Sequence, residues 1–468
     1  MGYIKNRELL LSAGEVELRR LALDIAEAGI AAADPGVAVH RHLRLDGNRG
    51  GSRDDNRDDG RLIVGDRVFD LSGGRRIFVI GAGKATFPIA KALDDILGPR
   101  IHKGLVTCKY GQGGTLAHIA LRLADHPIPD GSSLDAATET AKLLREVRPG
   151  DIVLACFTGG SSSLFVSPVP GVPLADKAAA GRILLTCGAN IIEINAVRKH
   201  LSTVKGGRLV RSLPAGVTLV NLTVSDVIGD RLDYITDPSV PDTSSFADAQ
   251  ATLDKYGLWD RLPASVAAHL RAAPAAAATV DAGGLAHLDR MDLLLVHNDA
   301  ACTGAAAAVR ALGLTPLLLS TVFEGESSTL GRTMVAVAKQ IQADGNPVPA
   351  PCVLIGGGET TVTIAGNAGE GGPNQEFAVG AAVELDGMRG VVAIGLDTDG
   401  TDGPTGYAGG LADGRTVSIA RSAGHDLHRA LRLHDVTPAL RDSGHILSTG
   451  ATGTNVNDLK LVVVVPSA

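Results

Sequence analysis

The chain has 468 residues, a formal net charge of −7 and an aromatic content of 3%. The negative charge and the scarcity of aromatic side chains exclude the basic, base-stacking surface that is typical of nucleic-acid-binding proteins. The five cysteines are widely spaced and form no CxxC pair, so we expect reduced thiols in a cytoplasmic protein rather than a zinc or redox site. No signal peptide is expected, because the N-terminal segment has no long uncharged apolar core and no clear cleavage site. No membrane-spanning segment is expected either, because no run of 18 apolar residues occurs.

Taken in chain order, the predicted elements alternate between helix and strand. Apolar residues recur at helical spacing over residues 15–33, which predicts an amphipathic helix. Residues 46–60 are polar and rich in glycine, and we expect a solvated loop because the EF-hand spacing is absent. The alternation that follows implies parallel strands joined by crossover helices. Strands are predicted within residues 75–83, 104–111, 151–160, 216–226, 292–299, 352–366, 390–404 and 459–466, and helices within residues 85–98, 133–147 and 174–188.

The sequence GAGKAT at residues 81–86 follows the first of these strands. It is not a dinucleotide fingerprint, because Thr86 holds the last position and the next strand ends near Lys109 instead of an acidic residue. It is not a P-loop either, because Ala85 follows the lysine. The pattern that remains is a turn between a strand and a helix with Lys84 at the helix start. Free N–H groups and the helix dipole favour an anion there.

Two further segments have groups that suit anions. Residues 158–165, TGGSSSLF, offer hydroxyl and backbone donors after a strand. Residues 193–209 carry a cluster of cations next to Asn195, and on a helix Arg198, Lys205 and Arg208 would share one face. A solvated basic face and an anion-binding face are both open for this cluster.

Acidic and amide side chains gather in the loops that follow later strands. The aspartates of these loops include Asp226, Asp399 and Asp402, and Asn455 and Asn457 follow near the C-terminus. Oxygen ligands of this kind suit Mg²⁺, which binds one or two carboxylates together with phosphate. Asp-Gly pairs also form plain turns. Several such loops beside three anion-type loops favour phosphate chemistry.

Six motifs occur in a fixed order: GAGKA, INAVRKHLSTVKGGR, VSDVIGD, GGGETTVTIAG with GGPNQEF, DTDGTDGPT, and TGATGTNVNDL. With these motifs the chain resembles the bacterial glycerate 2-kinase family, whose members have also been named hydroxypyruvate reductases. The resemblance runs from about residue 8 to the C-terminus, with residues 46–60 as an insertion. It implies two α/β domains, a larger Rossmann-like domain over residues 1–285, of the DUF4147 type, and a smaller MOFRL-containing domain over residues 286–468. The active site is expected in the cleft between them.

The resemblance also implies a reaction and its site. It implies ATP-dependent phosphorylation of the 2-hydroxyl of D-glycerate or a related sugar acid, with Mg²⁺ as a cofactor. Lys84, Asp226 and Asp399 are the expected catalytic residues, and Asp226 and Asp399 the expected metal ligands. The expected substrate- and phosphate-binding residues are Gly81, Gly83, Gly159, Gly160, Ser161, Ser162, Asn195, Arg198, Lys199, Lys205, Glu359, Asn374, Gln375, Glu376, Asp402, Thr452, Asn455 and Asn457.

Pro373 stands in the segment GGPNQEF where the family usually has arginine. Proline offers neither a guanidinium group nor a backbone N–H, so we expect a changed preference among hydroxy acids. Two other functions stay open, an NAD(P)H-dependent hydroxypyruvate reductase and a homologue that binds its ligands without turnover. The expected partners are a nucleotide and a small hydroxy acid, with no nucleic acid and no membrane, and a homodimer is left open.

Overall fold

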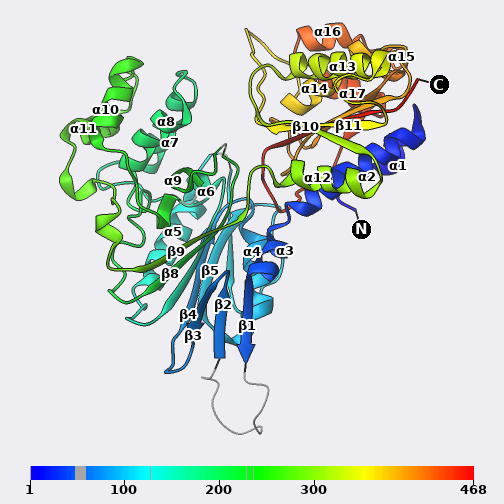
Figure 1. The fold of residues 1–468 in the computed structure, drawn as a ribbon. Helices are drawn as coiled ribbons and strands as arrows, with labels where there is room; N and C mark the ends of the chain where they lie inside the picture. The colour runs from blue at the N-terminus through cyan, green and yellow to red at the C-terminus, as the bar shows by residue number, and fades with distance from the viewer. Residues whose placement is uncertain (1, 48–59, 127, 228, 236, 468) are drawn as a thin grey trace. The chain divides into compact units, whose positions relative to one another are not determined.

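The computed structural model describes residues 2–47, 60–126, 128–227, 229–235 and 237–467 (Figure 1). The chain forms two compact units. Unit 1 comprises Met1–Asp34, Asp226–Gly229 and Val296–Ala468, and unit 2 comprises Pro35–Ser225 and Asp230–Leu295. Both units combine helices with a six-stranded sheet, which confirms the predicted α/β class.

Unit 2 is built on a parallel sheet. Its strands, with those of a small second sheet, are β1 (Leu43–Gly47), β2 (Gly60–Val64), β3 (Arg67–Asp70), β4 (Ile77–Ala82), β5 (Ile101–Lys109), β6 (Ala120–Ala124), β7 (Ile152–Phe157), β8 (Thr218–Val224) and β9 (Asp289–Val296). The main sheet has the order β6-β5-β4-β7-β8-β9. The pairs β4–β5, β4–β7, β5–β6 and β7–β8 are all parallel, as the alternation predicted. Every residue of β4, β7 and β8 is buried, as expected of parallel strands covered on both faces.

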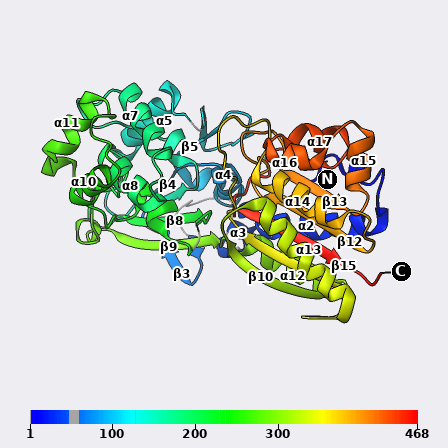
Figure 2. The ribbon, with the colours of Figure 1, turned by 90° about the horizontal axis from the view of Figure 1, so that it is seen from above.

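Helices cover this sheet and form a separate cluster beside it. They are α3 (Pro35–His42), α4 (Thr86–Leu97), α5 (Gly131–Leu144), α6 (Ser161–Leu164), α7 (Leu174–Leu185), α8 (Ile191–His200), α9 (Leu232–Ile235), α10 (Phe246–Lys255) and α11 (Ala264–Ala272), with short 3-10 turns η1 (Gly98–Arg100), η2 (Asp237–Ser239), η3 (Ala275–Ala277) and η4 (Gly283–Leu285). α5 begins with a capping box of Asp130 and Ser133 and packs Ala137 and Leu144 against Phe78 and Ile80 of β4. Helices α7, α8, α10 and α11 share their own apolar core (Figure 2).

The polar segment at residues 46–60 joins two antiparallel strands, because Gly47 at the end of β1 pairs with Gly60 at the start of β2. Residues 48–59, which contain most of the predicted insertion, lie outside the described residues. The sheet β1-β2-β3 is separate from the parallel sheet of unit 2.

Unit 1 contains a mixed sheet. Its strands are β10 (Thr315–Phe323), β11 (Cys352–Gly358), β12 (Val391–Asp397), β13 (Gly409–Asp413), β14 (Ile446–Leu447) and β15 (Asp458–Val464), in the order β10-β11-β15-β12-β13-β14. Only β10–β11 is a parallel pair among these described strands, and β15 lies antiparallel to both β11 and β12. The prediction that the alternation implies parallel strands is therefore wrong for this half of the chain. A fully buried strand has a continuous apolar sequence in either direction, so the residue pattern of β15 does not reveal its orientation.

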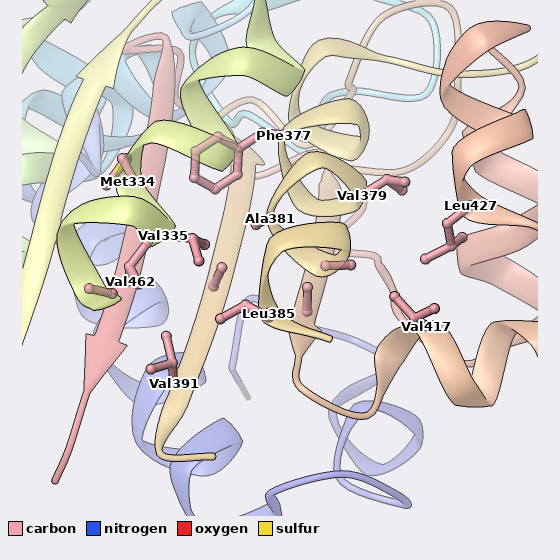
Figure 3. Close-up of a cluster of buried hydrophobic side chains, with 14 of the residues drawn as sticks. Met334, Val335, Phe377, Val379, Ala381, Leu385, Val391, Val417, Leu427 and Val462 are labelled. Carbon is pink, nitrogen blue, oxygen red and sulfur yellow. The ribbon is translucent and has the colours of Figure 1, made fainter. Parts of the chain in front are cut away.

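Helices lie on both faces of this sheet (Figure 1). They are α1 (Arg7–Leu10), α2 (Val16–Ala32), α12 (Ala300–Ala311), α13 (Ser327–Asp344), α14 (Pro373–Leu385), α15 (Thr416–Ser422), α16 (Leu427–Arg432) and α17 (Val436–Asp442). The core of one face places Phe377 and Leu385 of α14 between Val335 of α13, Val391 of β12 and Val417 of α15 (Figure 3). α14 is buried along nearly its whole length. In the described part of the chain, no helix has the length and apolar character needed to span a membrane.

The N-terminal segment packs in unit 1, whereas the predicted N-terminal domain spans residues 1–285. Small residues explain this packing, because α2 crosses α12 where neither helix has room for a side chain. A Cβ atom on Gly29 would lie 2.9 Å from the carbonyl oxygen of Ala301, and one on Gly304 would lie 2.2 Å from Cβ of Ala32. Helical periodicity predicts α2 but does not tell which half of the chain covers its apolar face.

A buried polar cluster fixes α2 to the sheet of unit 1. The guanidinium group of Arg19, only 1% exposed, donates to Asp413 at 2.7 Å and to the carbonyl oxygen of Leu10 at 2.9 Å. It also lies 2.9 Å from Nε2 of His445. Burial raises the pKa of Asp413, but the hydrogen bond and charge of Arg19 hold it below its usual value. Burial and the neighbouring Arg19 lower the pKa of His445 from 6.5 to about 4.

We expect this histidine to make unit 1 less stable in mild acid. Its folded-state pKa lies below its unfolded value, so its contribution is complete above pH 6.5 and is lost as pH falls towards 4. The shift corresponds to about 3 kcal/mol of unfolding free energy. Denaturant unfolding of the wild type and of His445→Gln between pH 7 and pH 4 should show the difference between the two proteins changing by about that amount. An exposed-histidine control, His428→Gln, should run parallel to the wild type. A difference in unfolding free energy between the wild type and His445→Gln that stays constant with pH would contradict this role of His445.

Candidate active site

The turn between β4 and α4 places Lys84 against the loop that follows β7. The N–H of Lys84 donates to the carbonyl oxygen of Gly159 at 2.9 Å. A Cβ atom on Gly160 would lie 3.1 Å from Cγ of Lys84 and 3.3 Å from Nε2 of His126, so both side chains lie beside this glycine. Gly160 has φ of +85°, in the left-handed region that favours glycine. The two loops predicted to accept anions therefore lie side by side in unit 2.

The glycines of the Lys84 turn are required for close packing. A Cβ atom on Gly81 would lie 2.4 Å from the carbonyl oxygen of Cys156. Gly83 has φ of +144°, and a Cβ there would lie 2.1 Å from the hydroxyl oxygen of Thr158. These contacts hold β4 and its turn tightly against β7, and they explain both glycines without a ligand.

The three serines form the short helix α6, in which Ser161 and Ser163 are buried. The Ser162 hydroxyl accepts a hydrogen bond of 2.8 Å from Nζ of Lys205. Lys205 also forms a buried ion pair with Asp237, whose carboxylate accepts from the N–H of Gly206. The serine loop and the cation cluster are thus joined by Lys205.

Arg198, Lys205 and Arg208 do not share one face of a helix, which is the arrangement that their spacing predicts. α8 ends at His200, and Lys205 follows in turns where Gly206 and Gly207 have positive φ. Asn195 is buried on α8. Lys199 is neutralised by a buried ion pair with Asp242 at 2.7 Å, whereas no ion pair or hydrogen bond of the Arg198 guanidinium group occurs among the described residues.

The acidic loops meet in unit 1. Nδ2 of Asn455 donates to the carboxylate of Asp226 at 3.2 Å. The carboxylate of Asp399 accepts from the N–H and hydroxyl groups of Thr401 at 2.8 and 2.6 Å, and the N–H of Thr452 donates to the carbonyl oxygen of Asp399 at 3.3 Å. Asp399 follows β12, Thr452 and Asn455 precede β15, and Asp226, which follows β8 in the chain, joins this set of loops through its hydrogen bond with Asn455.

Asn457 belongs to the same loops and adopts a left-handed backbone conformation. It has φ of +63°, and within the described part of the chain its buried Nδ2 has no hydrogen-bond partner. No group of three or more His, Cys, Asp or Glu side chains arranged to hold a metal ion occurs in the described residues.

Other predicted site residues support the start of α14. The carboxylate of Asp402 accepts from the N–H groups of Asn374 and Gln375, each at 2.9 Å, and from both side-chain amides. Burial raises the pKa of Asp402 to about 6, although these N–H groups lower it. Nδ2 of Asn374 also donates to Asp458 at 2.6 Å, and Asp458 pairs with the fully buried Lys460 at 2.7 Å. The hydrogen bonds of Asn374, Gln375 and Asp402 are therefore used within unit 1, between these residues and with neighbours such as Asp458 and Thr405.

Three residues near these elements have different surroundings. Glu376 is buried, with its pKa raised by burial, and its carboxylate lies 2.8 Å from Nδ1 of His434. Glu359 is exposed just after β11. Pro373 is the first residue of α14, a position that proline favours because no helical hydrogen bond uses its N–H.

Sequence reasoning missed three residues that lie among these groups. His126 lies beside Gly160 and Lys84. Lys177 and Arg182 of α7 line a cavity together with Ser162 and Arg198. Both cations come from a segment that the sequence predicts only as a helix, and the sequence has no signal that distinguishes them from solvated surface residues.

Comparison with known proteins finds two family matches and several near full-length relatives. Residues 21–271 match the family described as Domain of unknown function (DUF4147), and residues 352–458 match the MOFRL family. The glycerate 2-kinase of Pyrococcus horikoshii is 36% identical over 456 residues, which cover 96% of this chain and 98% of that protein. The D-glycerate 2-kinase of Thermotoga maritima is 39% identical over 394 residues, covering 83% and 91%. A crystal structure of glycerate kinase from Thermotoga maritima has a TM-score of 0.78 at 35% identity, covering 96% of this chain and all of the other.

We expect Asp402 to be essential for the stability of unit 1. Asp402→Ala removes the acceptor for two N–H groups in the first turn of α14 and one of the two acceptors of each buried side-chain amide, which keep only Asp458 and Thr405. Loss of a helix cap and of buried hydrogen bonds together should lower the unfolding free energy by about 2–4 kcal/mol. Asp426→Ala is the matched control, because Asp426 caps α16 from an exposed position. Thermal unfolding should show a clearly smaller loss for the control, and equal losses would contradict the role of burial.

Proposed function

Because the chain belongs to the glycerate kinase family that carries DUF4147 and MOFRL domains, we propose that it transfers the γ-phosphoryl group of ATP to the 2-hydroxyl of D-glycerate or a closely related sugar acid. The observation that carries this proposal is the near full-length similarity to relatives named glycerate 2-kinase. The cation and carboxylate sets of the two units support it, because phosphoryl transfer depends mainly on positioning and on neutralising charge.

The chain's own residues can be given roles in this reaction. The hydroxyl oxygen of the acid attacks the γ-phosphorus, the bond to the β–γ bridging oxygen breaks, and ADP leaves with that electron pair. Lys84, held against the Gly159–Gly160 loop, would stabilise the charge on the transferred phosphoryl oxygens. Asp226 or Asp399 would accept the proton of the hydroxyl group.

The acidic loops of unit 1 also fit Mg²⁺. Their ligand atoms are carboxylate and amide oxygens of Asp226, Asp399 and Asn455, the hard donors that Mg²⁺ prefers. Mg²⁺ is commonly held by one or two protein carboxylates, with water and substrate phosphates as its other ligands. When bound, it would neutralise phosphate charge. We propose Asp226 and Asp399 as the residues that hold it.

We expect the purified protein to form a phosphate monoester from ATP and a sugar acid. A panel of D-glycerate and four-carbon sugar acids, with ³¹P NMR of the products, should show phosphorylation at the 2-hydroxyl. The activity should disappear in excess EDTA and return with added Mg²⁺. A parallel assay with hydroxypyruvate follows the absorbance of NADH and NADPH. Consumption of either nucleotide without any phosphate ester would replace the kinase proposal with the reductase.

Lys84→Ala should leave the protein folded and lower kcat/KM by about 10²-fold or more, the effect of removing one group that stabilises transition-state charge. Lys91→Ala is the matched control, because Lys91 lies exposed on α4 and pairs with Asp95. It should leave kcat/KM within about twofold of the wild type, as expected for an exposed ion pair. Unchanged kcat/KM in a folded Lys84→Ala protein would exclude a role for this lysine in the transfer.

A further inference from the structure

A cavity of about 230 Å³ lies in unit 2 between α6, α7 and α8. Four cationic side chains line it, Lys177 and Arg182 of α7, Arg198 of α8, and Lys205 of the following turn. The Ser162 hydroxyl lines it as well and is held by Lys205 at 2.8 Å. Neither family similarity nor the motif spacing assigns Lys177 or Arg182 to a site.

The positive charge of this cavity is only partly balanced. Lys205 pairs with Asp237. Nζ of Lys177 donates to the carbonyl oxygen of Leu201 at 2.8 Å and to that of Arg198 at 3.5 Å, and neither acceptor carries a full charge. In the described part of the chain, Arg198 has no carboxylate within ion-pair distance.

The protonation equilibria of these groups indicate the same imbalance. Burial holds the pKa of Lys177 well below its ordinary value, and the positive charges of Lys205 and Arg198 add to the effect. Burial also lowers the pKa of Arg198 and the pKa of Lys205, and the negative charge of Asp237 raises both in the opposite direction. Buried cations that repel one another are stabilised when an anion enters among them.

Size and lining restrict which anion this cavity can hold. Pockets that enclose drug-sized ligands have volumes of about 300–1,000 Å³, and this cavity is smaller, so it would not enclose a whole nucleotide. Between the cations, Val166, Leu184 and Leu201 supply an apolar wall. A carboxylate next to a short carbon chain matches this combination better than a free phosphate ion, which would leave the apolar wall without a partner.

We propose that this cavity binds the hydroxy-acid substrate, with the carboxylate on the Arg198 guanidinium group and the carbon chain against Val166 and Leu184. Arginine presents two parallel N–H donors that fit a carboxylate. Lys205 and the Ser162 hydroxyl then face the hydroxyl groups of the acid. The substrate class is a monocarboxylic sugar acid of three or four carbons. This inference rests on the proposed function, since it assigns the acceptor acid of the kinase to this part of unit 2.

Gly181 offers a way to fill the cavity without disturbing the fold. It lines the cavity from the middle of α7, and a Cβ atom built on it has no heavy atom within 4 Å. Replacing a helical glycine by leucine or alanine favours the helix. Gly181→Leu should therefore occupy the cavity in a stable protein, and Gly181→Ala serves as its small control.

Equilibrium binding tests the inference without turnover. Isothermal titration with D-glycerate and with D-erythronate, and separately with ADP, is carried out on the wild type, Gly181→Leu, Gly181→Ala, Arg198→Gln and Arg198→Lys. We expect Gly181→Leu and Arg198→Gln to weaken binding of the acid by at least tenfold, and ADP to bind within twofold of the wild type. The affinity of Gly181→Ala for the acid should stay within about threefold of the wild type. Arg198→Lys should recover only part of the affinity, because lysine keeps the positive charge but lacks the two parallel N–H donors of arginine.

Other outcomes overturn the assignment. Unchanged acid binding in both Gly181→Leu and Arg198→Gln, or no acid binding by the wild type, would show that the cavity is not the acid site. Loss of ADP binding with acid binding retained would assign the cavity to the nucleotide phosphates instead. The kinase proposal is rejected by a different result. If the acid binds in the cavity but no phosphoryl group is transferred from ATP, the kinase function is rejected and this inference stands. If Gly181→Leu phosphorylates the acid with an unchanged KM, the kinase function stands and the cavity is rejected as the acid site.

Discussion

The buried ion pair between Arg19 and Asp413 ties helix α2, near the N-terminus, to strand β13 in the C-terminal part of the chain. Both side chains are almost fully buried, and a charge of either kind left alone there would cost about 3–5 kcal/mol. His445 completes the cluster as a neutral neighbour 2.9 Å from Arg19. Because Arg19 lies on α2 and Asp413 on β13, the ion pair joins two parts of unit 1 that most of unit 2 separates along the chain. The acidic loops at the ends of β12 and β15 depend on the sheet of unit 1.

Much of the fold could be predicted from the sequence, because apolar runs and glycine-rich ends mark strands in either unit. Three features could not. The direction of β15 is hidden because a fully buried strand has no polar face. The packing partner of α2 is set by Gly29 and Gly304, whose close approach is visible only in three dimensions. Helix α8 ends at His200, earlier than the helical spacing of the cations up to Arg208 suggests, and Gly206 and Gly207 have positive φ in the turns that follow.

The candidate site was predictable in its residue types but not in its pairings. Lys199 and Arg198 are neighbours in one motif, yet Asp242 neutralises Lys199 while Arg198 faces a cavity. An acidic partner 43 residues away along the chain cannot be inferred from the run of cations. In the same way, the motif containing Asn374 and Gln375 suggests polar ligand contacts, but Asp402 uses their N–H groups and amides. Motif order identifies the family, whereas burial and pairing decide which motif side chains remain for a ligand.

Pro373 bears on where anions can bind. Helix N-termini commonly hold anions through free N–H groups in the first turn. In α14 those groups are already used, since Pro373 has none, Asn374 and Gln375 donate to Asp402, and Glu376 donates to the carbonyl oxygen of Gly372. With proline in place of the expected arginine, this turn also has no guanidinium group. The start of α14 therefore has neither backbone donors nor a side-chain cation for a phosphate or carboxylate. In the proposed site, recognition of the anionic substrates would then depend on the cations of unit 2, Lys84 and Arg198 among them.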